Sequence, residues 1–246
     1  MDGRFNGVSR DPSEVPATAK RPSSYARLVD AAEEWVYQLN ENDHWVFRIY
    51  DQFNELHASI FMRGVRERGS RLDRMLECSD GSRARLRFLT TDDEESLVGL
   101  LASLDARYMP PHPRDRDTAT RALRRRSYLP FGIFIGDRMV GYVLLRLFFP
   151  WRVVTGIWTL PETHNLGLAQ LCLRQTCGFS GDEKIANYCT IPVDNHNSLR
   201  VALGVGWRIL RTNRRFHVLL WNEGCAPENV GNESVPSPAR PRSSTS

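Results

Sequence analysis

The fold of this chain is decided by the stretch TLPETHNLGLA at residues 159–169. It lies between a β-rich segment, residues 152–160, and a segment with apolar side chains at helical spacing, residues 168–179. The stretch therefore predicts an irregular turn from a strand into a helix. Such a turn exposes the first free N–H groups of the helix, which can bind a phosphate, and Gly167 and Ala169 permit close approach. Taken alone, one glycine in such a turn is also consistent with a tight connection that serves packing.

Length and composition indicate a folded, water-soluble protein. The chain has 246 residues, enough for one large domain or a domain with an extension, and its 41% hydrophobic and 25% charged residues are ordinary values. The apolar run at residues 139–149 contains Arg146 and is shorter than the roughly 20 residues of a membrane helix. The N-terminus has no apolar signal region. We therefore expect neither export nor a membrane partner.

Cysteine usage and charge narrow the function classes. The five cysteines form no CxxC pair, which argues against a disulfide framework and a zinc site and predicts reduced thiols in the cytoplasm. The net charge of +4 is mild, and the densest basic run lies at residues 121–126. That run is either a solvated helix face or an attraction for an anionic ligand or nucleic acid. No nucleic-acid-binding motif accompanies it, so we expect no nucleic acid partner.

Composition divides the chain into four segments. Residues 1–24 and 226–246 are rich in Pro, Ser, Asn and Gly, which predicts disordered tails. Between them we expect an N-terminal extension at residues 25–83 that packs on a core domain at residues 84–225.

The extension carries helical and strand signals. Apolar residues recur at helical spacing over residues 25–39 and 53–65, and residues 44–50 are consistent with a strand. A Ser-Asp-Gly turn at residues 79–81 predicts a hairpin. The extension is therefore predicted to be α-rich.

The boundaries between predicted helices and strands are clearer in the core domain. Its predicted elements, in chain order, are a strand at 84–89, a capped, acid-rich helix start at Thr90 with a helix to about residue 107, a helix at 115–127, strands at 131–135, 139–147 and 152–160, the turn and helix at 161–179, a strand at 184–191, a helix at 197–203, and strands at 207–211 and 216–221. This order predicts a mixed sheet flanked by helices.

A second landmark lies downstream of the turn. The stretch IPVDNHNS at residues 191–198 joins a predicted strand to a predicted helix, and Gly206 and Trp207 follow that helix. This arrangement resembles the strand-Asn-helix-Gly-aromatic signature of the GNAT N-acetyltransferase superfamily, with Asn195 and Gly206 at the family's spacing.

The turn at residues 164–169 is similar to the acetyl-CoA loop of the same superfamily, which has the form Q/R-x-x-G-x-G/A. The match is at Gly167 and Ala169, and His164 replaces the family's Gln or Arg. The preceding residues 159–162 resemble the hydrophobic-x-Pro-Glu end of the family's fourth strand. The resemblance covers about residues 84–221. It implies an α/β (α+β) fold with a mixed, mostly antiparallel central sheet flanked by helices.

The resemblance implies acetyl-CoA, or a related acyl-CoA, as co-substrate. In the family, backbone N–H groups of the loop hold the pyrophosphate, and free backbone groups at the end of the fourth strand pair with pantetheine amides. The implied binding residues of this chain are Thr159, Leu160, His164, Asn165, Leu166, Gly167, Leu168, Ala169, Gln170 and Asn195. The alternative for Asn195 is that it fixes the strand-to-helix turn.

The implied reaction is direct attack of an amine on the thioester carbonyl, helped by positioning and by hydrogen bonds to the developing oxyanion. Many family members protonate the thiolate with a Tyr in the helix after the signature Asn, where this chain has Ala202. A carboxylate on the fourth strand often serves as base, and residues 153–158 contain none. The candidate substitutes are Glu162, Tyr188 and His196, and His164 and Cys189 are also within reach through a water.

Each candidate also has a structural alternative. Glu162 and His164 can shape the loop, Tyr188 can pack, Cys189 can be a small buried apolar residue, and His196 can be a surface residue at a helix start. The sequence contains no Ser-His-Asp, Cys-His or metal constellation that would support another class of enzyme.

The sequence therefore predicts a cytoplasmic N-acetyltransferase that moves an acetyl group from acetyl-CoA to a primary amine of an unidentified small molecule or polypeptide. A catalytically silent module that binds acyl-CoA or a partner protein stays open, as does a homodimer. A transferase of longer acyl chains is a further alternative and requires a wider apolar channel near Phe148, Phe149 and Trp151. We expect the acceptor wall in residues 108–126 and in the extension, whose arginines suit an acceptor with a carboxylate or phosphate.

Overall fold

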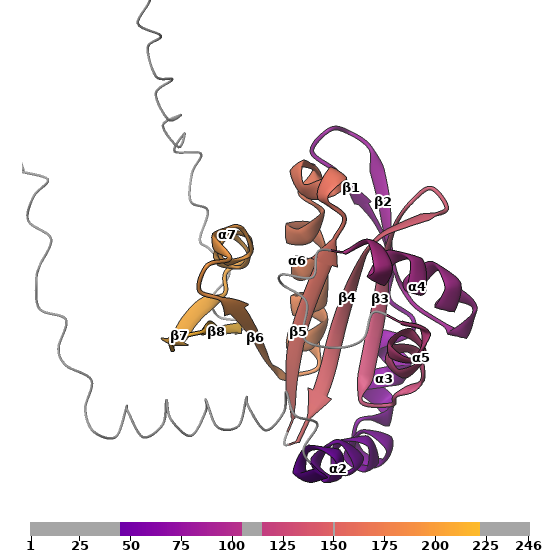
Figure 1. Ribbon diagram of the computed structural model, residues 1–246, viewed down its shortest axis with the longest axis vertical. Helices are drawn as coiled ribbons and strands as arrows, with labels where there is room; N and C mark the ends of the chain where they lie inside the picture. The colour runs from indigo at the N-terminus through magenta and orange to yellow at the C-terminus, as the bar shows by residue number, and fades with distance from the viewer. Residues whose placement is uncertain (1–44, 105–114, 150, 222–246) are drawn as a thin grey trace, which may run out of the picture. The chain divides into compact units, whose positions relative to one another are not determined.

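The computed structural model describes residues 45–104, 115–149 and 151–221, all within one compact unit that begins at Trp45. Within this part, helices flank a single sheet (Figure 1). The two tails and the first helix of the extension were predicted for segments that lie outside the described residues.

The described part begins with two helices, α2 (Trp45–Phe61) and α3 (Arg63–Gly69). The strand predicted at residues 44–50 is wrong, because its described residues form the start of α2. The helix predicted next to it is confirmed, with an earlier start and a break at Met62. The described part of the extension, residues 45–83, is therefore α-rich, as predicted.

Helix α2 buries a polar side, which explains why its pattern was misread. Asn54 and His57 are buried, at 3% and 6% exposure. Asn54 Oδ1 accepts a hydrogen bond from the backbone N–H of Phe149 at 3.2 Å, and Glu55 accepts one from the N–H of Arg126 at 2.8 Å. The large apolar side chains of the helix are exposed instead: Ile49, Phe53, Leu56, Ile60 and Phe61.

The remaining elements follow the predicted order. They are β1 (Asp73–Glu77), β2 (Arg83–Phe88), η1 (Thr91–Asp93), α4 (Glu94–Ser103), α5 (Arg116–Arg124), β3 (Tyr128–Ile135), β4 (Arg138–Phe148), β5 (Arg152–Thr159), η3 (Pro161–Leu166), α6 (Leu168–Asp182), β6 (Ala186–Pro192), α7 (His196–Gly204), β7 (Arg208–Thr212) and β8 (Phe216–Trp221). The predicted hairpin is confirmed as β1 and β2. A capping box between Thr90 and Asp93 opens the segment of η1 and α4, as the acid-rich start predicted.

The eight strands form one sheet in the order β1-β2-β3-β4-β5-β6-β8-β7. All neighbouring strands pair antiparallel except β5 and β6, which pair parallel. The sheet is thus mixed and mostly antiparallel, as predicted.

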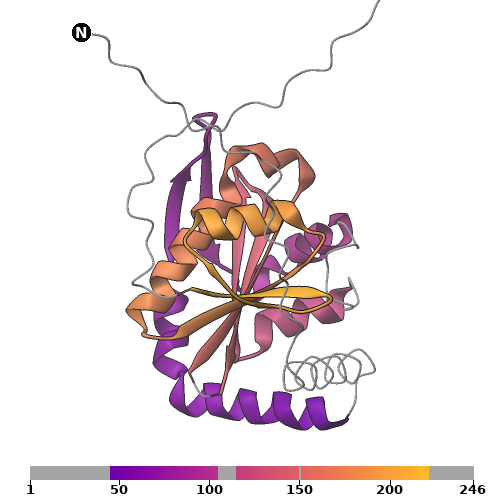
Figure 2. The same cartoon turned by 90° about the vertical axis from the view of Figure 1, so that its left-hand side faces the viewer.

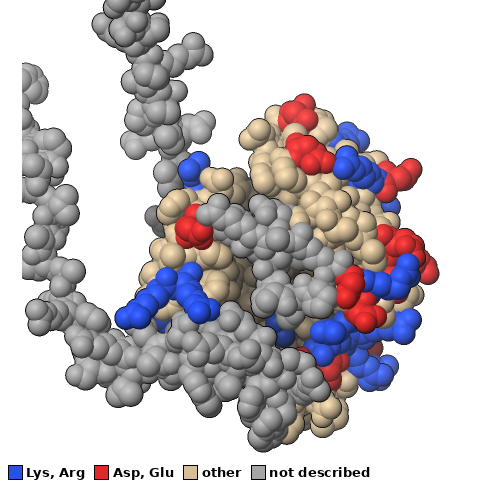
Figure 3. All heavy atoms as spheres, in the orientation of Figure 1, with Lys and Arg blue, Asp and Glu red and all other residues tan. Residues whose placement is uncertain are grey.

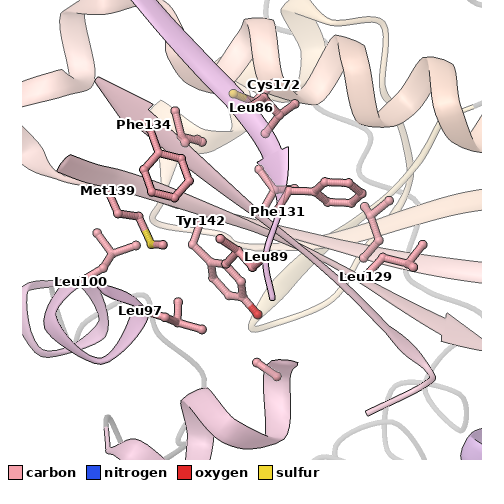
Figure 4. Close-up of a cluster of buried hydrophobic side chains, with 14 of the residues drawn as sticks. Leu86, Leu89, Leu97, Leu100, Leu129, Phe131, Phe134, Met139, Tyr142 and Cys172 are labelled. Atoms are coloured by element: carbon pink, nitrogen blue, oxygen red, sulfur yellow. The ribbon is translucent and has the colours of Figure 1, made fainter. Parts of the chain in front are cut away.

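Helices cover both faces of the sheet. On one face Cys172 of α6 lies beside Leu86, and on the other Leu97 and Leu100 of α4 lie near Tyr142 (Figure 4). Because side chains alternate along a strand, neighbouring residues of β4 and β5 point to these two different layers.

The C-terminal strands have an apolar core of their own, separate from the main core of the sheet. It is formed by Leu173, Cys177, Cys189, Ile191, Ala202, Val205, Trp207 and Leu219. Since α6 contributes to both cores, it joins the two parts of the sheet while each part keeps its own packing.

Candidate functional site

Strands β5 and β6 diverge soon after they meet. They pair over only three residue pairs, which end at Val154 and Tyr188, whereas β5 continues to Thr159 and β6 to Pro192. Figures 1 and 2 show β6 leaving the line of β5. On its other edge β5 stays paired with β4 as far as Thr159. The edge of β5 toward β6 therefore has no strand partner over residues 155–159, and its backbone groups can bind a ligand.

A buried polar network lies at the apex, the point where the two strands part. Thr155 Oγ1 donates a hydrogen bond to Asn187 Oδ1 at 2.6 Å, and Asn187 Nδ2 donates one to Ser180 Oγ of α6 at 3.2 Å. Asn187 is fully buried. Because buried polar groups are costly when unpaired, this network fixes the two strands and α6 in one arrangement. The sequence analysis missed this network. The signal that could have shown it is Asn187, a polar residue that lies between the buried apolar residues Ile185 and Cys189.

The turn after β5 has the predicted strand-to-helix form. It consists of η3 and Gly167, which adopts the left-handed conformation with a φ of 72° and precedes α6. No side chain caps the N-terminus of α6, so its first N–H groups are available to an anion. A side chain carbon placed on Gly167 would meet no atom within 4 Å, which shows that the space beside the turn is open.

The β1–β2 hairpin is bonded to this turn. Ser79 Oγ donates a hydrogen bond to the carbonyl of Asn165 at 2.9 Å, and the Ser79 N–H donates one to the carbonyl of Leu166 at 3.2 Å. These two hydrogen bonds hold the carbonyl groups of Asn165 and Leu166 toward the hairpin. Nothing in the local sequence indicated this contact, which joins residues 86 positions apart.

The other predicted binding residues differ in their surroundings. Leu160 is buried, and its N–H donates to the carbonyl of Val140 at 2.9 Å. Leu168 is buried too, so its backbone is the part that can reach a ligand. Asn195 Oδ1 accepts a hydrogen bond from the N–H of Ser198 at 3.1 Å and caps α7, which is the structural alternative considered for it.

The structure does not bring the three predicted catalytic residues together. Glu162 lies in η3, after the far end of β5, where it forms an exposed ion pair with Arg138 at 2.8 Å. Its own backbone N–H and then Arg138 hold the pKa of Glu162 below the usual range of a carboxyl. His196 is exposed at the first residue of α7. Tyr188 alone lies at the apex, opposite Val154.

Cys189, the neighbour of Tyr188, is buried, and this burial raises the pKa of its thiol. A neutral, buried thiol is a poor nucleophile, so Cys189 has the packing role that the sequence also allowed. Among the residues that the structure describes, no cluster of His, Cys, Asp or Glu could hold a metal ion. No helix of the described residues is long and apolar enough to cross a membrane.

A hollow of about 210 Å³ opens at the apex. It is lined by Tyr50, Phe148, Phe149, Arg152, Val154 and Tyr188. Phe148 and Arg152 are partners in the β4–β5 ladder, and Val154 and Tyr188 are the last pair of the β5–β6 ladder. The side chains from the strands thus converge on the face of the sheet opposite to the Thr155–Asn187 network.

The same face carries an aromatic stack above the hollow. The rings of Tyr142 and Trp158 lie parallel, with centroids 5.7 Å apart and planes at 18°. A side chain carbon on Gly156 would come within 2.4 Å of the Trp158 ring, so this ring lies over Gly156 on the diverging part of β5. The hydroxyl of Tyr142 is buried and has no hydrogen-bond partner among the described residues, and its burial raises its pKa.

Several arginines of the described surface form ion pairs with acids. Figure 3 shows Lys and Arg side chains interspersed with Asp and Glu over the side of the molecule that carries α4 and α5. Within the basic run at residues 121–126, Arg125 forms an ion pair with Asp51 at 2.7 Å, so this arginine serves the attachment of α2. Arg116 contacts both Glu94 and Glu95.

The sequence matches the model of a known protein family. The family model described as "Acetyltransferase (GNAT) domain" matches residues 83–208. No curated protein matches the chain.

Several solved structures share the fold. The GNAT domain of S. lividans PAT is 16% identical with a TM-score of 0.55, over 61% of this chain and 96% of that one. Mycobacterium smegmatis RimJ, in complex with CoA-disulfide, is 14% identical with a TM-score of 0.52, over 63% and 89%. The ribosomal-protein-S5-alanine acetyltransferase from Vibrio fischeri is 11% identical with a TM-score of 0.50, over 58% and 96%. At these identities the similarity is one of fold.

Proposed function

This chain belongs to the GNAT acetyltransferase family, and from that premise we propose that it is an N-acetyltransferase that uses acetyl-CoA to acetylate a primary amine. The observation that carries the proposal is the diverging pair β5–β6, whose open edge ends in the uncapped N-terminus of α6. This combination offers hydrogen bonds along an extended ligand and an anion site at its end.

The residues present fit acetyl-CoA. The N–H groups of Gly167, Leu168, Ala169 and Gln170 would hold the pyrophosphate, since the α6 start has no capping side chain. The edge of β5 at residues 155–159 would pair with the pantetheine amides, because no strand occupies it. RimJ, one of the structures with the same fold, is described in complex with CoA-disulfide, which supports this assignment.

Catalysis would rest on positioning and on Tyr188. Bound acetyl-CoA supplies an acetyl thioester, which an unprotonated amine attacks so that the C–N bond forms and the C–S bond breaks. Tyr188 lies at the apex and can donate its hydroxyl proton to the leaving thiolate, while the proton of the amine passes to water. The residue would replace the tyrosine that many family members carry at the position of Ala202. Glu162 and His196 remain weaker proposals, since neither lines the hollow.

The proposal is tested first by cofactor binding. Gly167→Glu would place a carboxylate beside the anion site and force a left-handed φ on a residue with a side chain, so acetyl-CoA binding measured by calorimetry should be lost. Gly99→Glu is the matched control, because Gly99 lies on α4 and a side chain carbon there meets no atom within 4 Å. Unchanged binding by Gly167→Glu would refute the site.

Activity is tested by CoA release from acetyl-CoA with a panel of amines. Tyr188→Phe should lower kcat by about 100-fold or more without weakening acetyl-CoA binding. Binding of acetyl-CoA without CoA release across a broad panel would instead support a silent acyl-CoA-binding module.

The hollow favours one second candidate, a transferase of longer acyl chains. The sequence analysis expected a wider apolar channel for such chains near Phe148, Phe149 and Trp151. Phe148 and Phe149 line the hollow, and Trp151 is not among its lining residues. Thermal-shift titration with acetyl-, hexanoyl- and longer acyl-CoA separates the two functions. A larger stabilisation by hexanoyl-CoA than by acetyl-CoA at equal concentration would favour the longer chain.

The state of the cysteines bears on the cellular compartment in which the reaction takes place. Cys78, Cys172, Cys177 and Cys189 are buried and free, which supports a reducing, cytoplasmic environment. The acceptor is a small molecule or a polypeptide.

A further inference from the structure

We propose that the hollow at the apex binds the amine acceptor, and that the acceptor carries a carboxylate which pairs with Arg152. The proposal rests on the proposed function and names the substrate class of the same site.

The position of the hollow makes it the approach to the reacting carbon. Val154 and Tyr188 close the β5–β6 ladder, and both side chains line the hollow. On the other face of the sheet, a buried hydrogen-bond network occupies the position behind the hollow. It joins Thr155 and Asn187 to Ser180 of α6. An acceptor therefore reaches the apex from the side of the hollow.

Arg152 is the cation available in the hollow. It is exposed at the start of β5, and its guanidinium lies 5.8 Å from the centre of the Tyr188 ring. No carboxylate of the described residues lies within ion-pair distance of Arg152. Arg146, on the same face, differs, because it lies 3.7 Å from Asp51.

The charge of the hollow selects among anions. Arg152 is the sole charged residue among the six described residues that line it. A planar guanidinium matches a carboxylate through two parallel hydrogen bonds. One positive charge balances a carboxylate, whereas a phosphate monoester carries nearly two negative charges at neutral pH. The hollow therefore fits an amine with one carboxylate.

The walls select a compact, partly apolar acceptor. Tyr50 of α2 stacks on Phe148, with ring centroids 6.2 Å apart and planes at 21°. Helix α2 precedes residues 83–208, so Tyr50 lies outside the segment that the family model matches. A hollow of about 210 Å³ is smaller than the roughly 300 to 1,000 Å³ of sites for drug-sized ligands. An acceptor of amino-acid size, with an aromatic or branched side chain, fits these features.

Matched acceptor pairs test the proposal. L-phenylalanine is compared with phenethylamine, and L-leucine with 3-methylbutylamine, because each pair differs by one carboxylate. We expect wild-type kcat/KM to be about tenfold higher for the carboxylated member, because a hydrogen-bonded charge pair supplies about the free energy of a tenfold change in affinity. Arg152→Gln should remove this preference with the KM for acetyl-CoA unchanged. Arg208→Gln, at the exposed start of β7, is the control and should keep it.

Binding provides a readout that does not need turnover. Calorimetry of L-phenylalanine into the CoA-loaded protein should show binding by wild type and by Arg208→Gln, and about tenfold weaker binding by Arg152→Gln. Arg152-dependent binding without acetyl transfer would refute the proposed function and would support only the pairing of the ligand's carboxylate with Arg152.

Three results would overturn the acceptor class while leaving acetyl transfer intact. The first is equal kcat/KM within both pairs, and the second is a preference that survives Arg152→Gln. The third is a higher kcat/KM for phosphoethanolamine than for every carboxylated amine.

Discussion

Replacing Gly156 by alanine should destabilise the protein through the Trp158 ring. Gly156 has an ordinary strand conformation, so the backbone itself accepts a side chain. The added carbon would lie 2.4, 2.9 and 3.1 Å from three atoms of the ring. Because the shortest of these contacts is sterically forbidden, the ring has to move, and it leaves its stack with Tyr142.

The size of the effect follows from these contacts. Forcing an added methyl group into packed side chains costs about 1 to 3 kcal/mol. Alanine returns about 0.4 to 1 kcal/mol by restricting the unfolded chain. The midpoints of these two ranges give a net loss of about 1.3 kcal/mol, which lowers the Tm by about 3 to 5 °C in a domain of this size.

Thermal unfolding followed by circular dichroism measures this loss. Gly99→Ala is the control, because Gly99 is exposed on α4 and an added carbon meets nothing, so its Tm should stay equal or rise. In a Trp158→Ala background the ring is absent, and Gly156→Ala should then cost nothing further. An equal loss in both backgrounds would refute the explanation by a clash.

Three further predictions concern hydrogen bonds. Ser79→Ala should raise the Kd for acetyl-CoA about two- to tenfold and leave kcat unchanged, because the turn loses one of its two bonds to the hairpin. Asn187→Leu should lower the free energy of unfolding by about 1 to 3 kcal/mol, since Thr155 Oγ1 is left buried without a partner, and adding Thr155→Val should recover part of that loss. Asp93→Asn should cost about 1 to 3 kcal/mol at pH 7, because Asp93 accepts two hydrogen bonds from Arg87. The pKa of Asp93 is held below its usual range, first by Arg87, so this difference is present above about pH 4 and disappears as the pH falls through the folded pKa.

Each of these predictions has an outcome that contradicts it. Ser79→Ala with an unchanged Kd would show that the hairpin does not position the turn. A Thr155→Val, Asn187→Leu double variant no more stable than Asn187→Leu would contradict the hydrogen bond between the two residues. A stability difference for Asp93→Asn that stays constant as the pH falls below about 4 would contradict its origin in the carboxylate.

Local signals account for the features that the sequence predicted. The run from strand β5 through Gly167 into α6 was found because turn chemistry, glycine and helical spacing act within a few residues. The order of elements from β1 to β8 was found for the same reason. The prediction of acetyl-CoA as co-substrate came from the family resemblance.

Helix α2 shows where local reasoning failed. Its aromatic and β-branched start is typical of a strand, but the helix docks through Asn54 and Glu55 on backbone N–H groups of Phe149 and Arg126. These partners lie 95 and 71 residues away, and no window of local sequence contains them.

The sequence by itself determined which segment forms the turn at Gly167 and that this turn joins strand β5 to helix α6, because both depend on near neighbours along the chain. Only the tertiary structure decided what surrounds that turn. It bonded Ser79 to the carbonyls of the turn, buried Asn187 against Thr155 where the strands part, and brought Tyr50 of α2 beside Phe148 in the hollow that Arg152 also lines. Each of these contacts joins residues distant in the sequence, and their pairing depends on the packing of the whole sheet rather than on any local preference.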